Sequence, residues 1–561
     1  MYHGFYGFKK NTKISLLVLA TMCLLGVSSL LLSPATAAGS TFYVSPSGSD
    51  ASVGSSSAPF KTLQAAVSKL KPGDTLNVKS GSYAGFIAGW DETGIYGVIS
   101  GTISQPITIQ ADPSAAAGSV IINSHNQKTA DGINFEPGCN YITIKGFTIK
   151  NSDGTITRSG IRYTESIGGK ILNNNVDGSG RSNIFTSHAQ NIDVENNIIS
   201  HSSQEHGIYV SNSADNPIVK NNTSFSNANG GIQLNADISN GGDGIIKNAL
   251  IEGNIIYDNG TAGGSAINLD GVQNSTIRNN VLYNNHSSGI ALFMQDGAEA
   301  SKNNLVVNNT ILMPSGSRWP INIDNKSTGN KVTNNILLND ASRHGSIEIS
   351  ADSLSGFVSD YNIVTNIFMA DKNTGDTNLT LAQWQAKTGQ DKHSFIANAA
   401  DLFVNSAAND YHLVNDSPAV DAGTLVMVAS DIEGSARPKG AGDDIGAYEF
   451  DSESPASTTP TPAPEQTNVV PTDTSATAPS VPVSTQSSES QNWLLITVII
   501  VLAVFVVTLL IVLIAILWSQ GRKNKYQEQM QNQSQNQPQN QSQNQMPGPG
   551  QNQMPPQGPG V

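Results

Sequence analysis

The chain has 561 residues, and only 13% of them are Asp, Glu, Lys or Arg, about half the share in a typical soluble protein. Its 30 basic and 44 acidic residues give a formal net charge of −14. This composition argues against a nucleic-acid-binding protein, which needs basic patches, and against coiled coils, which are built from Glu, Lys and Arg.

Residues 1–37 have the order of a secretory signal peptide. Three lysines precede an apolar run from Ile14 to Leu32, and the small-residue pattern Ala35-Thr36-Ala37 follows. We therefore expect cleavage after Ala37 and export of the remaining chain. Because the apolar run is long for a signal peptide, an uncleaved membrane anchor is the alternative.

Residues 131–350 repeat a unit of two short strands. The first strand opens with a small residue and Ile, as in Gly207-Ile208-Tyr209-Val210 and Gly231-Ile232-Gln233-Leu234. In the second half of the unit an Asn recurs at spacings of 22, 25, 32, 26, 29 and 26 residues. The recurring residues are Asn175, Asn197, Asn222, Asn254, Asn280, Asn309 and Asn335.

A period of this length, with alternating strands and no helical face, indicates one solenoid coil per repeat. Stacked at the strand spacing of about 4.8 Å, each Asn amide would donate to the next and satisfy buried turn carbonyls. The sequence thus predicts an all-β, right-handed parallel β-helix over residues 131–350. Residues 38–130 would hold an N-terminal cap and the first coils, and residues 351–450 the last coils and a closing segment.

The C-terminal part of the sequence predicts a membrane anchor. Residues 451–492 are rich in Pro, Ser and Thr, which is typical of an extended stalk. Residues 493–518 are apolar, carry no charge and are long enough to cross a bilayer of about 30 Å as a helix. Arg522, Lys523 and Lys525 follow, so residues 519–561, a disordered Gln/Asn/Pro-rich tail, would be cytoplasmic. We expect a single-pass protein of the cell membrane with an extracellular β-helix domain.

The coils with their recurring Asn resemble the pectin-lyase-like, right-handed β-helix superfamily. The segment that begins TFYVSPSGSD resembles the N-terminal cap of secreted members, in which Leu63, Val67 and Leu70 at helical spacing would cover the open end of the core. The segment from YHLVNDSPAVDAG to DDIGAYEF, residues 411–450, looks like the closing segment of the same proteins. The resemblance spans residues 41–450 and is specific for fold, since the superfamily includes lyases, hydrolases, epimerases and non-catalytic surface proteins.

In β-helix enzymes of this resemblance, the site lies on the outer face of the strand that opens each coil. Alternation from the inward isoleucines places two polar columns on this face, and different side-chain chemistries converge on the three coils of residues 206–270. A solvated role is the alternative for each residue, because outward positions on a solenoid are polar anyway. The candidate catalytic residues are Asp270, Asp237, His206 and Tyr209, and the candidate substrate-binding residues are Gln233, Asn235, Asn268 and Arg162.

Two ways of cleaving a glycosidic bond fit these residues. A hydrolase needs two carboxyl groups about 5 to 9.5 Å apart, which Asp237 with Asp270, or Asp270 with Asp324, would supply. A lyase needs its uronate carboxylate neutralised and a base, and His206 or Tyr209 would be the base. We expect no required cofactor, with Ca²⁺ bound by Asp237 and Asp270 as the alternative.

The sequence departs from the best-marked enzyme families of this resemblance. Glu205 precedes His206-Gly207, where polygalacturonases have Gly-His-Gly, and their Asn-Thr-Asp and paired-Asp motifs are not found at the expected coils. The Asp-rich calcium motif and the catalytic Lys of the pectate-lyase branches are not found either. No catalytic residue is therefore carried over from these families.

The charge of the chain bears on its substrate. An acidic β-helix does not attract a polyanion by its overall field, so a uronate would need bound Ca²⁺ or local arginines such as Arg162 and Arg181. The leading hypothesis is a membrane-anchored extracellular enzyme that cleaves a polysaccharide as a lyase or hydrolase. The alternatives are a non-catalytic, glycan-binding surface protein or adhesin, and a sugar epimerase. The expected partners are a polysaccharide and the membrane, and not nucleic acid.

Overall fold

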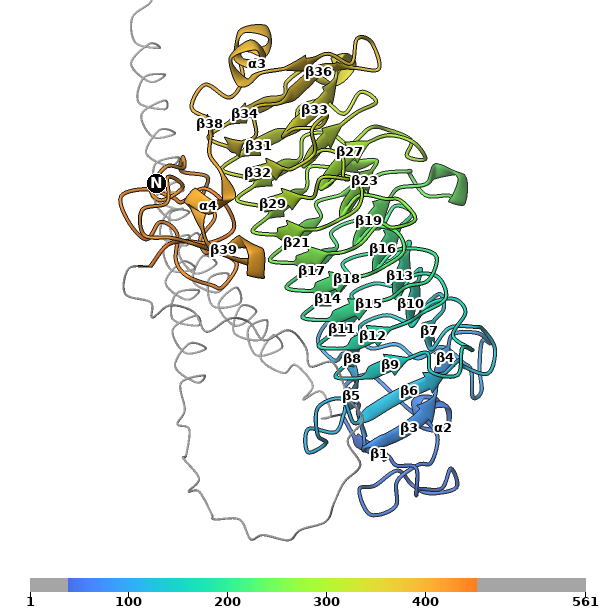
Figure 1. Ribbon diagram of the computed structural model, residues 1–561. Coiled ribbons are helices and arrows are strands. Elements are labelled where there is room, and N and C mark those ends of the chain that lie inside the picture. Colours follow the sequence, from blue (N-terminus) through green and yellow to red (C-terminus); the bar gives the residue numbers. More distant parts are fainter. Residues whose placement is uncertain (1–38, 452–561) are drawn as a thin grey trace, which may run out of the picture. The chain divides into compact units, whose positions relative to one another are not determined.

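The computed structural model describes residues 39–451, and these residues form a stack of coils with three long parallel sheets (Figure 1). The predicted signal peptide, nearly all of the predicted stalk, the apolar segment 493–518 and the Gln/Asn-rich tail lie outside the described residues. Between residues 39 and 451, no helix is long and apolar enough to cross a membrane. The anchor therefore stays a prediction.

Each coil contributes one strand to each of three 12-stranded sheets, here called A, B and C. Sheet A consists of β1 (Thr41–Val44), β2 (Thr75–Val78), β5 (Ile107–Ala111), β8 (Ile142–Lys145), β11 (Lys170–Leu172), β14 (Asp193–Glu195), β17 (Ile218–Lys220), β21 (Leu250–Glu252), β25 (Thr276–Arg278), β28 (Leu305–Val307), β31 (Lys331–Thr333) and β34 (Val358–Asp360).

In the coils from β8 to β35, sheet B follows sheet A after a two-residue turn. Its strands are β3 (Gly81–Ala84), β6 (Val120–Ser124), β9 (Thr148–Lys150), β12 (Asn175–Asp177), β15 (Ile198–Ser200), β18 (Thr223–Phe225), β22 (Ile255–Tyr257), β26 (Val281–Tyr283), β29 (Thr310–Met313), β32 (Ile336–Asn339), β35 (Ile363–Val364) and β38 (Phe395–Ile396).

Sheet C holds the strands that open the coils. They are β4 (Phe86–Ala88), β7 (Ile133–Phe135), β10 (Ile161–Thr164), β13 (Ile184–Ser187), β16 (Ile208–Ser211), β19 (Ile232–Asn235), β23 (Ile267–Asp270), β27 (Ile290–Phe293), β30 (Ile321–Ile323), β33 (Ile347–Ser350), β36 (Phe368–Lys372) and β37 (Asn378–Leu379), of which β37 runs antiparallel to β36.

Stacked isoleucines fill the core behind sheet C. The first residue of nine successive strands is a fully buried Ile, and each is in register with the next. In-register β-branched side chains pack well on a pleated surface, which explains why one residue type recurs at this position. The stack comprises Ile133, Ile161, Ile184, Ile208, Ile232, Ile267, Ile290, Ile321 and Ile347.

The predicted asparagine ladder is present at the turn from sheet A to sheet B. Nδ2 of Asn197 donates to Oδ1 of Asn222 at 2.9 Å and to the backbone oxygen of Ile171 at 2.9 Å. The ladder begins at Asn174 and not at Asn175 as predicted, because the turn takes two residues, a left-handed Asn173 (φ 54°) and then the ladder residue. Asn175 is exposed and opens β12. Three consecutive asparagines made the choice ambiguous in the sequence.

Helices close both ends of the stack. At the N-terminal end, α2 (Leu63–Val67) buries Leu63 and Val67, and Leu70 packs with them in the core, as the resemblance implied. At the other end, α3 (Leu381–Thr388) covers the core with Trp384, whose ring stacks on Phe368 with centroids 5.1 Å apart.

Residues 411–450, which the resemblance made the closing segment, lie along the flank of the coils instead of capping their end (Figure 1). The side chain of Asn279 donates to the backbone oxygen of Ser430, and the amide of Ala447 donates to the hydroxyl of Thr310. The preceding α4 (Ala399–Leu402) and the hairpin of β39 (Phe403–Asn405) and β40 (Asp410–Leu413) belong to the same flanking layer. A cavity lies between this flanking layer and sheet B.

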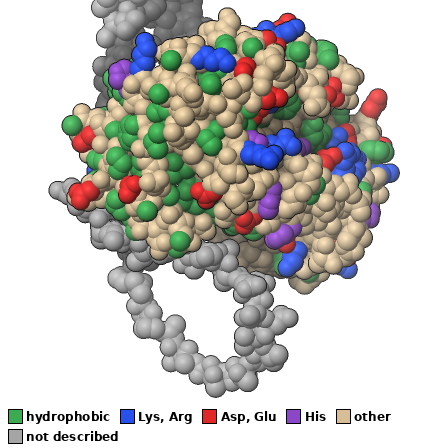
Figure 2. Space-filling view, turned by 45° about the horizontal axis from the view of Figure 1, so that its top comes forward, with side chains coloured by type: hydrophobic (Ala, Val, Ile, Leu, Met, Phe, Trp, Pro, Cys, Tyr) green, Lys and Arg blue, Asp and Glu red, His purple; other side chains and the backbone are tan. Residues whose placement is uncertain are grey.

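The surface carries few ions, in keeping with the composition. Figure 2 shows a face on which backbone and uncharged polar side chains predominate and charges of both signs are scattered. Cys139, the one described cysteine, is buried and unpaired, and burial raises the pKa of its thiol to about 11. Packing and hydrogen-bonded turns, with no disulfide among residues 39–451, therefore hold the coils together.

Candidate functional site

The outer face of sheet C brings together five of the eight predicted residues on three adjacent strands. Tyr209 of β16 is in register with Gln233 of β19 and with Asn268 of β23, and Asn235 is in register with Asp270. The predicted alternation is therefore confirmed for these strands. His206 directly precedes β16, Asp237 follows β19, and Arg162 lies on β10, two strands away from Tyr209.

One strand of this face was missed in the sequence. β13 lies between β10 and β16, and its Phe185 stands in register with Arg162 on one side and Tyr209 on the other. The repeat pattern has a small residue before the first Ile of the strand. In this coil Asn183 stands at that position, and its side-chain amide donates to Asn227. Isoleucine at position 184 was the signal that would have found it.

Tyr209 lies among rings and amides. Its ring meets those of Phe185 and His206 edge-on, with centroids 5.3 and 5.2 Å away, and Nδ2 of Asn235 lies 3.2 Å from its phenolic oxygen. Burial raises the pKa of Tyr209, so its phenol keeps the proton at neutral pH and suits an acid better than a base. Burial lowers the pKa of His206 to about 4, so its imidazole is neutral at pH 7 and accepts a proton less readily than a free imidazole.

Three arginines line a cavity of about 300 Å³ beside Tyr209. Arg158 pairs with the buried Asp131 at 3.3 Å, and Arg181 pairs with Glu205. Arg162 lies with its guanidinium 4.4 Å from the centre of the Phe185 ring and has no carboxylate partner among the described residues. The cavity therefore holds one guanidinium that makes no salt bridge within residues 39–451, next to an aromatic wall, although the chain as a whole is acidic.

Buried polar atoms without hydrogen-bond partners gather on this face. Native proteins satisfy nearly all such atoms, so a cluster of exceptions calls for a ligand or water to complete it. Four of them belong to residues predicted from the sequence. The atoms on this face are Oδ1 of Asn134, Nε of Arg162, Nδ1 of His206, Oε1 of Gln233 and Oδ1 of Asn235.

The two predicted catalytic aspartates hold loops. Asp270 is buried, and its carboxylate accepts hydrogen bonds from the backbone amides of Gln295, Asp296 and Gly297 at 2.9, 2.8 and 3.3 Å. Asp237 caps the short helix η1 (Ile238–Asn240) by accepting from the amide of Ser239 at 2.8 Å. Burial raises the pKa of Asp270, and the three amides oppose this rise.

These contacts do not favour the predicted Ca²⁺ site at Asp237 and Asp270. They also do not favour the carboxyl pairs that a hydrolase would need. Ca²⁺ needs six to eight oxygen ligands, and the oxygens of Asp270 already accept from three amides. Within residues 39–451 no three His, Cys, Asp or Glu side chains are grouped for a metal ion. Asp324, the other proposed partner of Asp270, is paired with Lys372 at 3.0 Å on a more distant coil.

Two family models match parts of the chain. Residues 98–253 match the model described as periplasmic copper-binding protein (NosD), and residues 235–383 match the model described as right handed beta helix region. No curated protein matches this sequence. Together with the three parallel sheets, the second model supports a right-handed parallel β-helix.

Solved structures with similar coordinates share little sequence with this chain. The pectate lyase Pel9A is 15% identical, with 74% of this chain and 98% of that chain covered and a TM-score of 0.45. A rhamnogalacturonan lyase is 14% identical, with 68% and 96% covered and a TM-score of 0.41. An alginate lyase from Paenibacillus sp. str. FPU-7 is 19% identical, with 51% and 93% covered and a TM-score of 0.37.

The first family description names copper, but the described residues do not offer a set of copper ligands. Copper in proteins is held by His, Cys and Met side chains. Residues 98–253 contain no Met, and their one Cys is the buried Cys139. Their histidines are not grouped, since His201 pairs with Asp177 on sheet B and His206 lies at sheet C. The residues present do not fit a copper centre, and no step is assigned to one.

Proposed function

We propose that this right-handed β-helix protein binds an acidic polysaccharide along the outer face of sheet C and cleaves it by β-elimination. The observation that carries the proposal is Arg162, which makes no salt bridge with the described residues and lies in a cavity beside Tyr209, among buried polar atoms that lack partners. An arginine fork suits a carboxylate, and amides without partners suit sugar hydroxyls. The cavity thus matches a uronate residue.

The side chains on this face support elimination better than hydrolysis. Hydrolysis needs two free carboxyl groups, whereas Asp237 and Asp270 are engaged with backbone amides. In elimination, the guanidinium of Arg162 neutralises the uronate carboxylate, and the neutral imidazole of His206 accepts the C5 proton. The C4–O bond then breaks as the C4–C5 double bond forms, and the phenol of Tyr209 gives its proton to the departing oxygen.

We further propose that the domain works outside the cell on a single-pass anchor. The support is in the sequence alone: a leader over residues 1–37, an uncharged apolar segment over 493–518, and Arg522 and Lys523 directly after it. Membrane attachment would hold the cleavage site close to the cell surface, where released oligosaccharides are retained.

The test is to incubate the full-length chain with polygalacturonate, alginate and neutral glycans, with and without a chelator. Elimination predicts ultraviolet absorbance from unsaturated uronates that persists in the chelator. New reducing ends without that absorbance would indicate hydrolysis instead. Exchange of the C5 proton without chain cleavage would indicate an epimerase. Binding of polyuronate without any product would support the rival proposal of a non-catalytic glycan-binding surface protein.

A further inference from the structure

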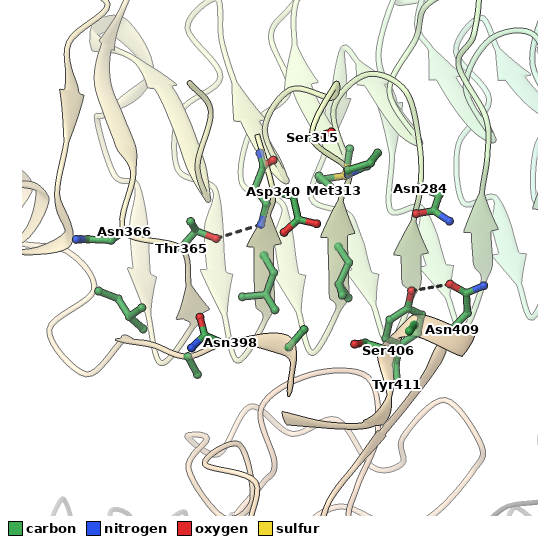
Figure 3. A pocket seen from close by; sticks show the side chains of 18 residues that line it. Asn284, Met313, Ser315, Asp340, Thr365, Asn366, Asn398, Ser406, Asn409 and Tyr411 are labelled. Carbon is green, nitrogen blue, oxygen red and sulfur yellow. Dashed lines mark hydrogen bonds between the residues drawn. The ribbon is translucent and has the colours of Figure 1, made fainter. Parts of the chain in front are cut away.

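A second cavity, of about 750 Å³, lies on the flank of the coils, away from sheet C (Figure 3). One wall comes from residues that follow successive strands of sheet B, namely Asn284, Ser315, Asp340 and Asn366. The other wall comes from the flanking layer, with Asn398, Ser406 and Asn409 facing the coils across the cavity (Figure 3). This cavity, here called the flank cleft, runs along several coils.

The floor and rim of the flank cleft differ in chemistry. Leu312 and Leu338 of sheet B form an apolar floor together with Ile396, which is 50% exposed. Amides and hydroxyls surround this floor. Asp340 is the only Asp, Glu, Lys, Arg or His among the lining residues, and no described group donates to its carboxylate. An exposed Ile and an exposed carboxylate in one cleft suit a ligand with apolar faces and hydroxyl donors.

The lining excludes other ligand classes. A metal ion would need several carboxylates, and Asp340 stands alone. An acidic glycan would meet Asp340 and no cation. A peptide that extends a sheet needs an open strand edge, and the one strand of sheet B with an open edge at this cleft is the two-residue β38. A pyranose ring offers an apolar face and a rim of hydroxyls, and one sugar unit advances about as far as the strand spacing of about 4.8 Å.

We propose that the flank cleft binds a neutral oligosaccharide, independently of the acidic polysaccharide assigned to sheet C. The carboxylate of Asp340 accepts from sugar hydroxyls, the amide of Asn398 donates to or accepts from them, and the pyranose faces rest on Leu312, Leu338 and Ile396. The protein then holds two saccharides of different charge, one on sheet C and one between sheet B and the flanking layer.

The experiment titrates the full-length chain with cellohexaose, xylohexaose, mannohexaose and maltohexaose by calorimetry. At least one hexaose should bind, and Asp340→Ala should weaken it tenfold or more. Ser315→Trp, at an exposed position on the rim, should block the cleft without touching the core. Asp91→Ala, which removes an exposed carboxylate from a distant loop, is the matched control and should leave binding unchanged.

Unchanged thermal unfolding midpoints would show that both cleft variants are folded. The proposal is overturned if none of the four hexaoses binds, or if both cleft variants bind as the natural chain does. It is also overturned if Arg162→Gln removes the binding, because the hexaose would then occupy sheet C. Retained hexaose binding in Arg162→Gln supports the flank cleft, whether or not polyuronate is cleaved.

Discussion

The side-chain amide of Asn235 donates to the phenolic oxygen of Tyr209 on the neighbouring coil, across 3.2 Å. The same nitrogen lies 3.1 Å from a carboxylate oxygen of Asp296, in the loop that Asp270 holds. Tyr209 is thus positioned by a chain of contacts that runs from β16 through β19 to the loop after β27. This chain connects the proposed acid to the loop that Asp270 holds.

Removing the phenol of Tyr209 should stop cleavage and spare binding. In Tyr209→Phe the ring still packs against Phe185 and His206, but no proton is available for the leaving oxygen, so the rate should fall about 100-fold or more. The readout is the initial rate of unsaturated product from polygalacturonate, with affinity measured separately. Tyr257→Phe, in the aromatic stack of sheet B, is the matched control. Full activity in Tyr209→Phe would exclude it as the acid.

Removing the charge of Arg162 should weaken uronate binding. A charge-assisted hydrogen bond is worth about 1.5–3 kcal/mol, so Arg162→Gln should lose about tenfold to 100-fold in affinity for a galacturonate oligomer. Calorimetry measures this change. Arg278→Gln is the control, because Arg278 pairs with Glu252 on sheet A. Equal affinities for the two variants would place the uronate elsewhere.

Asp270→Asn should act through the loop it holds. An amide cannot replace both carboxylate oxygens, so at least one of the amides of Gln295, Asp296 and Gly297 loses its acceptor, at a cost of about 1–3 kcal/mol in unfolding free energy. Hydrogen exchange at these amides should accelerate. Asp243→Asn, with an exposed carboxylate, should change neither quantity. If Asp270→Asn abolishes cleavage while stability and exchange stay unchanged, Asp270 is catalytic, as the sequence suggested.

Substitution of an asparagine in the ladder should lower the unfolding free energy more than substitution of an asparagine outside it. Oδ1 of Asn254 accepts from the backbone and side-chain nitrogens of Asn222, and its Nδ2 donates to the backbone oxygen of Val219 and to Asn280. Asn254→Ala leaves several buried partners unpaired, so denaturant unfolding should show a loss of about 3 kcal/mol or more. Asn229→Ala removes one peripheral bond and should cost under about 1 kcal/mol. Similar losses for the two would mean that the ladder adds no special stability.

The sequence repeats were sufficient to predict the fold, because each coil is formed by residues that are close together in the sequence. The alternation around Ile208 and Ile232 determines which side chains point outward, and parallel register then places Tyr209 beside Gln233. What the alternation does not encode is the path of the longer turns. Asp270 is on the predicted face, but the turn after Phe293, one coil further, brings three amides onto its carboxylate.

The arginine cavity could be predicted only in part for the same reason. Arg162 is on a strand and follows the alternation, whereas Arg158 and Arg181 lie in turns between strands. Their proximity depends on the coil of β13, which the sequence pattern missed. In that coil Asn183, and not a small residue, precedes Ile184. Residues 396–411, which include α4 and most of the β39–β40 hairpin, form one wall of the flank cleft, and no repeat pattern predicts where such a segment packs.

The buried imidazole of His206 should make the fold sensitive to mild acid. Its pKa falls from 6.5 in the unfolded chain to about 4 in the folded one, so between these values the unfolded chain binds a proton that the folded chain excludes. Stability is therefore lost as the pH falls from 6.5 toward 4, by up to about 3 kcal/mol at 1.36 kcal/mol for each pKa unit. His206→Gln removes this contribution, so the unfolding free energy of the variant should fall less than that of the natural chain between pH 6.5 and pH 4. Above pH 7 the two chains should show the same pH dependence. Urea unfolding at several pH values measures both profiles. Parallel profiles from pH 7 to pH 4 would mean that the pKa of His206 is the same in the folded and the unfolded chain, which would contradict a buried imidazole.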